Sequence, residues 1–254
     1  MTAVSASRDQ AEGPRPRLRR GSLTREIIVA ESLRLLDEDG LDGFSLPKLG
    51  RALGADQTAV YRHFASKDDL VLAIADQLID EAQAGLEPSA CWVDTLTEMA
   101  RRLRTTYLAH PAAASMSAYR TTQGPAEVRA VDIIIGSILQ AGFGGAEAAL
   151  MYRAVGDFAL SWAGLEASFL SLDKRLQQND RAAWRQAYLS VDREQYPSIW
   201  QVRMQLPEVD DNDIFEAILK TVMTGLRELA PRPCACHATA EHSPAQHSPA
   251  DLAD

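Results

Sequence analysis

Apolar residues in the first part of the chain recur at the spacing of short amphipathic helices. A first stripe runs over residues 28–36, and steps of three and four positions are typical of a helix with one buried face. Ser22 or Thr24 can cap its start. Gly40 predicts its end, because glycine is common just beyond a helix C-terminus.

Two shorter helices are predicted next. Ser45 opens one of them, with Pro47 in the first turn, where a missing N–H group does no harm. Gly54 breaks this helix, and Asp56 caps another that extends to Phe64. Two short helices joined by a three-residue turn with glycine are typical of a helix-turn-helix motif.

The rest of the pattern is also helical, and it predicts an all-α fold. A fourth helix begins after Ser66, and residues 172–210 form a more polar, partly helical connection. The other predicted helices cover residues 92–109, 112–119, 125–141, 145–171 and 211–229. The segments 145–171 and 211–229 are apolar on nearly every side, so they must be covered on every side.

The pattern divides the chain into four parts. Residues 1–21 and 231–254 are polar and aperiodic, and we expect a disordered basic arm and a disordered tail. Residues 22–70 form the predicted helix-turn-helix domain. Residues 71–230 form a larger helical domain.

The charge distribution favours DNA binding more than the net charge of −9 suggests. Residues 1–70 hold 11 basic and 11 acidic side chains, whereas the remainder holds 15 and 24. A local basic face is sufficient for DNA binding. Such a face is expected in the arm formed by Arg15, Arg17, Arg19, Arg20 and Arg25.

Several classes of protein are disfavoured. No segment approaches the roughly 18 uncharged apolar residues of a membrane span, and the first twenty residues lack the apolar core of a secretory signal. The three cysteines are too few for a disulfide framework. A reducing cytoplasm is therefore the expected compartment.

The segment from Leu49 to Asp76 resembles the DNA-binding domain of the tetracycline-repressor (TetR) family. The turn at Gly54, the run over residues 61–64 and Lys67 carry the resemblance. It implies a transcriptional regulator, usually a repressor, that binds a palindromic DNA operator. Two-fold symmetric recognition requires a homodimer with half-sites about one helical turn apart.

The third predicted helix carries residue types that suit DNA contacts. Glutamine pairs well with adenine and arginine with guanine, while threonine or alanine can contact a thymine methyl group. Tyrosine, histidine and lysine suit phosphate contacts. Pro47 departs from relatives that place a basic residue there. The candidate DNA-binding residues are Arg19, Arg20, Lys48, Gln57, Thr58, Ala59, Tyr61, Arg62, His63 and Lys67.

The C-terminal half resembles the effector domain of the tetracycline repressors themselves, in the segments 140–143, 147–150, 154–158 and 196–198. The resemblance implies that helices 145–171 and 211–229 form a four-helix dimer bundle. The alternative is that both are ordinary core helices.

Most polar drug contacts of that subclass are apolar here, which favours a mainly apolar small-molecule effector over metal-chelated tetracycline. The candidate ligand-binding residues are Gln83, Met99, Leu103, Tyr107, Ala118, Thr121 and Ile134. Met99, Leu103 and Ile134 can equally be ordinary core residues. The fourth helix, running from Lys67 toward Gln83, is the expected link between ligand and DNA.

Other functions have weaker support. Cys234, Cys236 and nearby histidines lack regular metal-ligand spacing, so no metal or cofactor is expected. Arg153 and Asp157 form an i, i+4 pair, which favours an ion pair over an acid–base couple. A helical ligand-binding protein that never binds DNA remains the main alternative. A helical enzyme is less favoured, since no catalytic constellation is evident.

Overall fold

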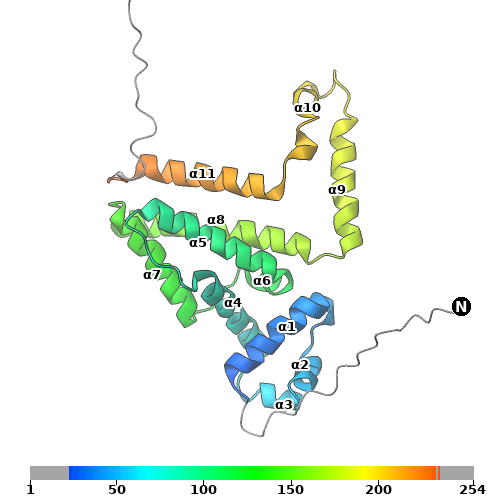
Figure 1. Cartoon of the computed structure of the whole chain (residues 1–254), viewed down its shortest axis with the longest axis vertical. Helices are drawn as coiled ribbons and strands as arrows, with labels where there is room; N and C mark the ends of the chain where they lie inside the picture. The colour runs from blue at the N-terminus through cyan, green and yellow to red at the C-terminus, as the bar shows by residue number, and fades with distance from the viewer. Residues whose placement is uncertain (1–22, 233, 235–254) are drawn as a thin grey trace, which may run out of the picture. The chain divides into compact units, whose positions relative to one another are not determined.

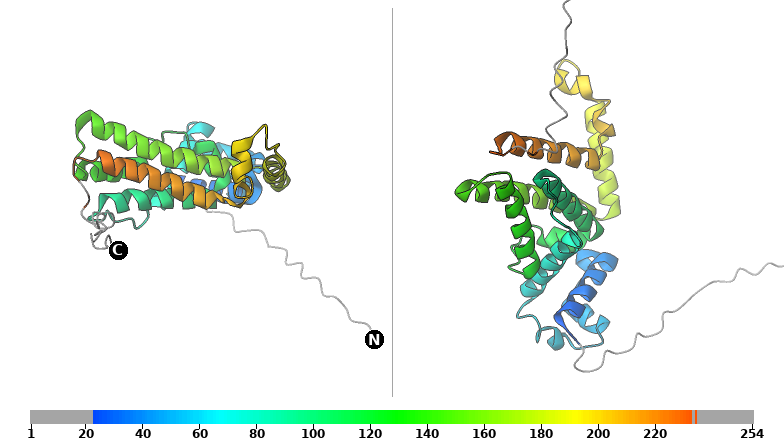
Figure 2. Two further views of the ribbon diagram at one scale, coloured as in Figure 1. Left: turned by 90° about the horizontal axis from the view of Figure 1, so that it is seen from above. Right: turned by 60° about the vertical axis from the view of Figure 1, so that its left-hand side comes forward.

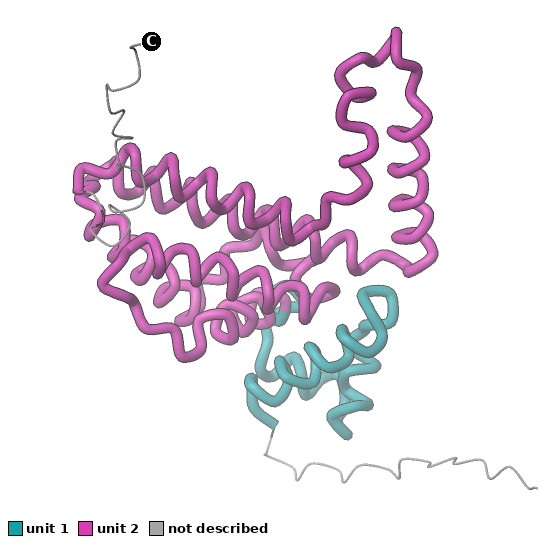
Figure 3. Tube along the Cα trace, turned by 45° about the horizontal axis from the view of Figure 1, so that its top comes forward, with its two compact units in different colours: residues 1–70 teal, residues 71–254 magenta. Residues whose placement is uncertain are grey.

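The computed structural model describes residues 23–232 and Cys234. These residues form helices, turns and loops, and no strand occurs among them. The all-α prediction is therefore confirmed. The chain divides into two compact units, residues 1–70 and 71–254 (Figure 3). None of the helices in the described ranges is long and apolar enough to cross a membrane.

The first unit contains α1 (Arg25–Gly43), α2 (Leu46–Ala52), α3 (Gln57–Val60) and the start of α4 (Lys67–Gln83). Each of these helices begins at a polar residue whose side chain accepts a backbone N–H bond. The capping residues are Thr24, Ser45, Asp56 and Ser66. The most deeply buried side chains of the unit are those of Ile28, Leu36, Leu49, Val60, Phe64 and Leu70.

Two glycines shape the turn between α2 and α3. Gly54 has φ +62°, a left-handed conformation that glycine adopts without steric cost. The N–H of Gly54 bonds to the Arg51 carbonyl at 3.0 Å, and that of Ala55 to the Gly50 carbonyl at 2.9 Å, the pattern of a Schellman motif. A Cβ at Gly50 would lie 3.1 Å from Ala55 O and Gln57 N. The two helices therefore approach closely at Gly50.

One predicted helix end agrees with the structure and another does not. α1 continues to Gly43, but Gly40 has φ +69° and ψ −173°, so the regular helix stops where the sequence predicts. The third helix was expected to reach Phe64 and ends at Val60. After Val60 the N–H groups of Arg62 and His63 bond three residues back. The segment tightens into turns and the longer prediction is wrong.

The second unit contains the rest of α4 with α5 (Trp92–Ala109), α6 (Pro111–Ser117), α7 (Pro125–Gln140), α8 (Gly145–Leu170) and α11 (Asp211–Leu229). α5 and α8 pack against each other, and each of them also packs against α6, α7 and α11. α11 runs alongside α8 (Figures 1 and 2). Tyr107, Leu96 and Ile138 lie fully within this core.

The connection between α8 and α11 forms a projecting arm (Figure 1). It contains α9 (Lys174–Leu189), α10 (Pro197–Val202) and the 3₁₀ helix η1 (Leu206–Glu208). None of these three elements has a buried residue. The prediction of a partly helical connection is confirmed, although α9 is longer than its sparse apolar residues suggest.

Candidate functional site

The segment around α3 presents polar side chains above a buried apolar layer. Val60 and Phe64 are each 1% exposed and anchor the segment. Asp56 Oδ1 accepts a hydrogen bond from Thr58 N at 2.9 Å, which fixes the start of the helix. The predicted DNA-contacting side chains separate into an exposed group of Thr58, Tyr61, Arg62 and Lys67 and a half-buried group of Gln57, Ala59 and His63.

Arg25 holds the end of this segment in place. Its guanidinium lies 4.1 Å from the centroid of the Phe64 ring and donates to the His63 carbonyl. It also lies 3.6 Å from the Asp69 carboxylate, which accepts from Ala65 N at 3.0 Å. Arg25 was expected in the basic arm. The structure places it instead in the first turn of α1, where it has intramolecular partners.

The two basic residues of α2 differ in exposure and pairing. Lys48 is half-buried, and its Nζ lies 2.7 Å from Asp39 Oδ2, a pairing that the helical periodicity did not reveal. Arg51, in the last turn of α2, is exposed and was not among the predicted contacts; its only sequence signal is a basic residue one turn before Gly54. Arg19 and Arg20 lie outside the described residues.

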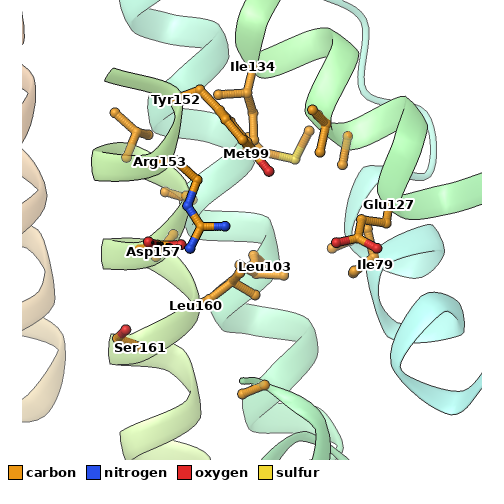
Figure 4. Close-up of a pocket in the computed structure, with 18 of the residues that line it drawn as sticks. Ile79, Met99, Leu103, Glu127, Ile134, Tyr152, Arg153, Asp157, Leu160 and Ser161 are labelled. Atoms are coloured by element: carbon orange, nitrogen blue, oxygen red, sulfur yellow. Dashed lines mark ion pairs between the residues drawn. The ribbon is translucent and has the colours of Figure 1, made fainter. Parts of the chain in front are cut away.

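A cavity of about 280 Å³ lies within the second unit (Figure 4). α4, α5, α7 and α8 and the loop before α7 supply its walls. Its apolar lining includes Ile79, Leu96, Met99, Leu103, Val131, Ile134, Val155 and Leu160. The walls are therefore largely aliphatic, which suits contact with an apolar molecule.

Five of the seven predicted ligand-binding residues line this cavity: Met99, Leu103, Ala118, Thr121 and Ile134. Gln83 and Tyr107 do not. The Nε2 of Gln83 donates to the Ala126 carbonyl at 2.9 Å, so this amide connects α4 to α7. Tyr107 is 1% exposed, and burial, with a smaller effect from Glu127, raises the pKa of its hydroxyl. Both residues belong to the core.

The cavity also contains charged groups that were not among the predicted ligand-binding residues. Arg153 and Asp157 form an ion pair of 2.8 Å on α8, as expected from their spacing, but both side chains are more than half exposed. Glu127 and Ile79 lie across the cavity from this pair (Figure 4). Helical periodicity does not show that these groups face a cavity, because they stand on the margins of apolar faces.

A hydrogen-bonded junction joins α4 to the start of α7 beside the cavity. The Asp76 carboxylate accepts from Glu127 N at 2.9 Å and from Ala126 N at 3.2 Å. The Thr122 hydroxyl lies 2.9 Å from both Asp76 Oδ1 and Glu127 Oε2. A carboxylate at a helix N-terminus is favoured by the helix dipole. The cavity wall at Glu127 is thus fixed to α4.

α8 and α11 together leave apolar side chains uncovered. On α8, Leu150 and Leu165 are each 62% exposed. On α11, a stripe at spacings of three and four comprises half-buried Ile214, Ile218 and Val222, exposed Gly225 and exposed Leu229. Between the two helices, the Phe158 and Phe215 rings stack with centroids 6.3 Å apart. The helices therefore share a core while each keeps an apolar outer surface.

Comparison with known families identifies the class of this protein. A family model described as "Bacterial regulatory proteins, tetR family" matches residues 28–74, and one described as "Tetracyclin repressor-like, C-terminal domain" matches residues 84–230. The chain belongs to the tetR family of bacterial regulatory proteins. The resemblance found in the sequence is confirmed.

Individual relatives agree. An HTH-type transcriptional regulator of Saccharopolyspora erythraea is 29% identical over 152 residues, or 60% of this chain and 64% of that protein, so the match spans less than two thirds of this relative. A possible TetR family regulator from Streptomyces coelicolor, known from its crystal structure, is 31% identical with a TM-score of 0.67, covering 80% of this chain and 98% of that one. ActR from Streptomyces coelicolor, crystallised with actinorhodin, is 22% identical with a TM-score of 0.71 over 83% of this chain and 98% of that one; this likeness shows the fold alone.

Proposed function

We propose that this protein is a DNA-binding transcriptional repressor that acts as a homodimer and releases a palindromic operator when a small molecule binds. The observation that carries the proposal is the exposed polar surface at α3, where Thr58, Tyr61 and Arg62 stand above buried Val60. An exposed threonine on a short, well-anchored helix and an exposed arginine in the turn that follows it are suited to base contacts in a major groove. Membership of the tetR family supports the same function.

Selection from a pool of random double-stranded oligonucleotides tests this function. We expect one palindromic site, with half-site centres about 10 base pairs apart and an affinity that falls steeply as salt rises. Recovery of no sequence by folded protein, after refolding from denaturant to remove co-purified ligand, would contradict the proposal.

The effector that we propose is a mainly apolar small molecule held in the cavity. Met99, Leu103 and Ile134 supply aliphatic surface, and Glu127 with the Arg153–Asp157 pair supplies a few polar contacts. A site with many apolar walls and few buried polar partners discriminates against a polar, metal-chelated ligand. ActR, which shares the fold, was crystallised with actinorhodin.

A thermal-shift screen checks the effector class, with polycyclic apolar compounds compared against magnesium–tetracycline. We expect stabilisation by members of the apolar set. Ala130→Phe, which places a ring in the cavity, should abolish the shift, whereas Ala182→Phe on exposed α9 should preserve it. Stabilisation by magnesium–tetracycline alone would contradict this part of the proposal.

The proposed response is a shift between two populations of the dimer, of which the ligand stabilises one. Ile79 and Ala82 of α4 line the cavity, and Asp76 and Gln83 bond to α7, so α4 is the element on which the ligand acts. A 100-fold difference in affinity corresponds to about 2.7 kcal/mol. We also propose that the protein binds the small molecule without converting it chemically. We place its action in the cytoplasm, where operator DNA lies.

A further inference from the structure

One carboxylate in the wall of the cavity has an oxygen that its own hydrogen bonds leave open. The Glu127 side chain lines the cavity and points into it beside Ile79 (Figure 4). Within the described residues, the hydrogen bonds that reach this carboxylate both end on Oε2. They come from the Thr122 hydroxyl at 2.9 Å and from Gln123 N at 2.7 Å. The other oxygen, Oε1, is therefore available to a ligand.

The bonds on Oε2 fix how Glu127 is presented to the cavity. Glu127 is the third residue of α7, and its bond to Gln123 N reaches back across the start of the helix, as in a capping box. Its backbone N–H donates to Asp76 of α4 at 2.9 Å. Both the backbone and the side chain of Glu127 are thus held in place. An acceptor that is already fixed loses less conformational entropy when a ligand binds.

The other charged groups of the cavity are arranged differently. Asp157 is paired with Arg153 at 2.8 Å, and both side chains are more than half exposed. Arg120 also lines the cavity and is engaged in an interaction of its own. Glu127 is half-buried, so water and salt screen its charge less than they screen the exposed pair. The cavity therefore favours a positive group at Glu127 over one at Asp157.

The surface next to Glu127 is apolar. Ile79 lies beside it, and Met99, Leu103 and Ile134 extend the aliphatic wall. An entirely apolar ligand would cover Oε1 without giving it a hydrogen bond, and burial of an unpaired charged oxygen costs free energy. A ligand with an ammonium group would cover the same walls and donate a charge-assisted hydrogen bond to Oε1.

We propose that the effector of this cavity is an amphipathic amine, with an apolar body against the aliphatic walls and a protonated amino group that donates to Glu127 Oε1. The inference rests on the proposed function, because it assigns a ligand class to the same cavity. It narrows the effector from a mainly apolar molecule to one that carries a positive charge. Glu127 determines specificity, and the aliphatic walls supply most of the contact surface.

Fluorescence titration of the full-length protein, in the absence of DNA, tests the proposal with probes of similar shape and different charge. 9-(Aminomethyl)anthracene carries an ammonium group, 9-anthracenemethanol carries a neutral hydroxyl group, and anthracene-9-carboxylate is an anion. We expect the ammonium probe to bind at least about tenfold more tightly than the neutral probe, because its hydrogen bond is charge-assisted. The anion should bind most weakly.

Two substitutions on α7 assign the preference to one side chain. Glu127→Gln keeps the side-chain length and an oxygen that can accept from Gln123 N, and glutamine also suits this helix position, so the variant should fold normally. It should bind the neutral probe as before and lose the preference for the ammonium probe. Asp132→Asn removes a negative charge from an exposed position of the same helix and should retain the preference.

The outcomes separate this inference from the proposed function. Equal binding of the ammonium and neutral probes, or a preference that survives Glu127→Gln, would overturn the amine and leave the apolar cavity in place. Tightest binding of the anion would do the same, and would point to Arg120 or Arg153 as the anchor. If none of the probes bound, the proposed effector cavity and this inference would both be wrong.

Discussion

Arg62 and Lys67 are both exposed basic residues in the first unit, but the proposed function gives them different tasks. Arginine presents a planar fork that can pair with one guanine, whereas lysine presents a point charge that suits phosphate. A base contact depends on the sequence of the DNA, and a phosphate contact does not. The two side chains therefore provide a matched pair for testing how α3 and its surroundings bind DNA.

Arg62→Ala should weaken operator binding by about 1–3 kcal/mol and relax the preference at one base pair of each half-site. Lys67→Ala should weaken binding to all sequences alike and reduce the slope of log affinity against log salt by about one per chain. Fluorescence anisotropy on the selected operator and on single-base variants measures both effects.

Arg185→Ala, on exposed α9, is the control and should leave both quantities unchanged. If Arg62→Ala and Lys67→Ala gave the same loss on every sequence, the assignment of base readout to Arg62 would be wrong.

At the scale of single residues, the sequence pattern correctly predicted which apolar side chains face the interior. Met99 and Leu103 recur on one face of a helix, and both line the cavity. Tyr107 shares that periodicity but lies in the core, because spacing does not distinguish a filled interior from a cavity wall. The Lys48–Asp39 ion pair joins two helices, and one sequence contains no signal for such a contact.

At the scale of elements, Asp76 provides the main link from α4 to the start of α7. The two oxygens of Asp76 accept from different backbone N–H groups, Oδ1 from Glu127 and Oδ2 from Ala126, and Asp76→Asn replaces one of these oxygens with an NH₂ group. We expect a loss of about 1–3 kcal/mol in the free energy of unfolding, since partly buried donors lose their partner. Urea denaturation followed by circular dichroism measures the change.

Asp80→Asn is the matched control on the same helix. Asp80 pairs with Arg129, and both side chains are more than half exposed, so its loss should cost at most about 1 kcal/mol. Equal effects of the two substitutions would show that the junction at Asp76 contributes no more than a surface ion pair.

Arg104 joins three helices of the second unit. From α5 it forms a two-pronged ion pair with Glu166 of α8 at 2.7 and 2.8 Å, and its guanidinium lies 4.7 Å from the centroid of the Phe215 ring on α11. Both members of the pair are at most 13% exposed. Arg104→Met leaves the Glu166 carboxylate buried without its partner and should cost about 3–5 kcal/mol, measured by denaturation.

Arg101→Met, on the same helix, serves as the control. Arg101 pairs with Glu216, and both side chains are more than one third exposed, so a loss of about 1 kcal/mol or less is expected. Hydrogen bonding to Arg101 lowers the pKa of Glu216. The contribution of this pair to the free energy of unfolding is therefore fully present when the pH is above the ordinary carboxyl pKa. It should be lost as the pH falls through the lowered pKa of Glu216. A larger loss for Arg101→Met than for Arg104→Met would contradict the assignment.

Helices with strong apolar stripes were the elements that the sequence predicted best. α5 and α11 have the predicted bounds, residues 92–109 and 211–229. α3 was predicted too long, because Phe64 keeps helical spacing with Val60 although the backbone between them is tightened into turns. α9 has no buried residue, so it carried little apolar signal.

At the scale of the whole molecule, the proposed dimer rests on α8 and α11. Ile218 lies at the centre of the half-exposed apolar stripe on α11. Ile218→Asp places a charge in the proposed interface and should convert a dimer into a monomer of 27.8 kDa. Size-exclusion chromatography with light scattering reports the mass.

Lys220→Asp introduces the same side chain at an exposed position of α11 outside the stripe, and it should remain dimeric. A wild-type protein that is monomeric at micromolar concentration would contradict the dimer, as would dimers of both variants.

The all-α fold could be read from periodicity alone, and the family from the residues around the turn at Gly54. The cavity lined by Met99, Leu103 and Ile134 could be predicted only by resemblance, because its walls come from helices that are distant in the chain. The charged groups at its margin appeared only when α4, α7 and α8 were assembled.

The most direct test of the central claim is a titration of the purified protein against its selected operator and a scrambled duplex, at two salt concentrations, with the mass of the complex measured in parallel. We predict two chains per operator, affinity at least about 1,000-fold above that for the scrambled duplex, and a steep loss of affinity with salt. Equal affinity for both duplexes, or one chain per operator, would contradict the account.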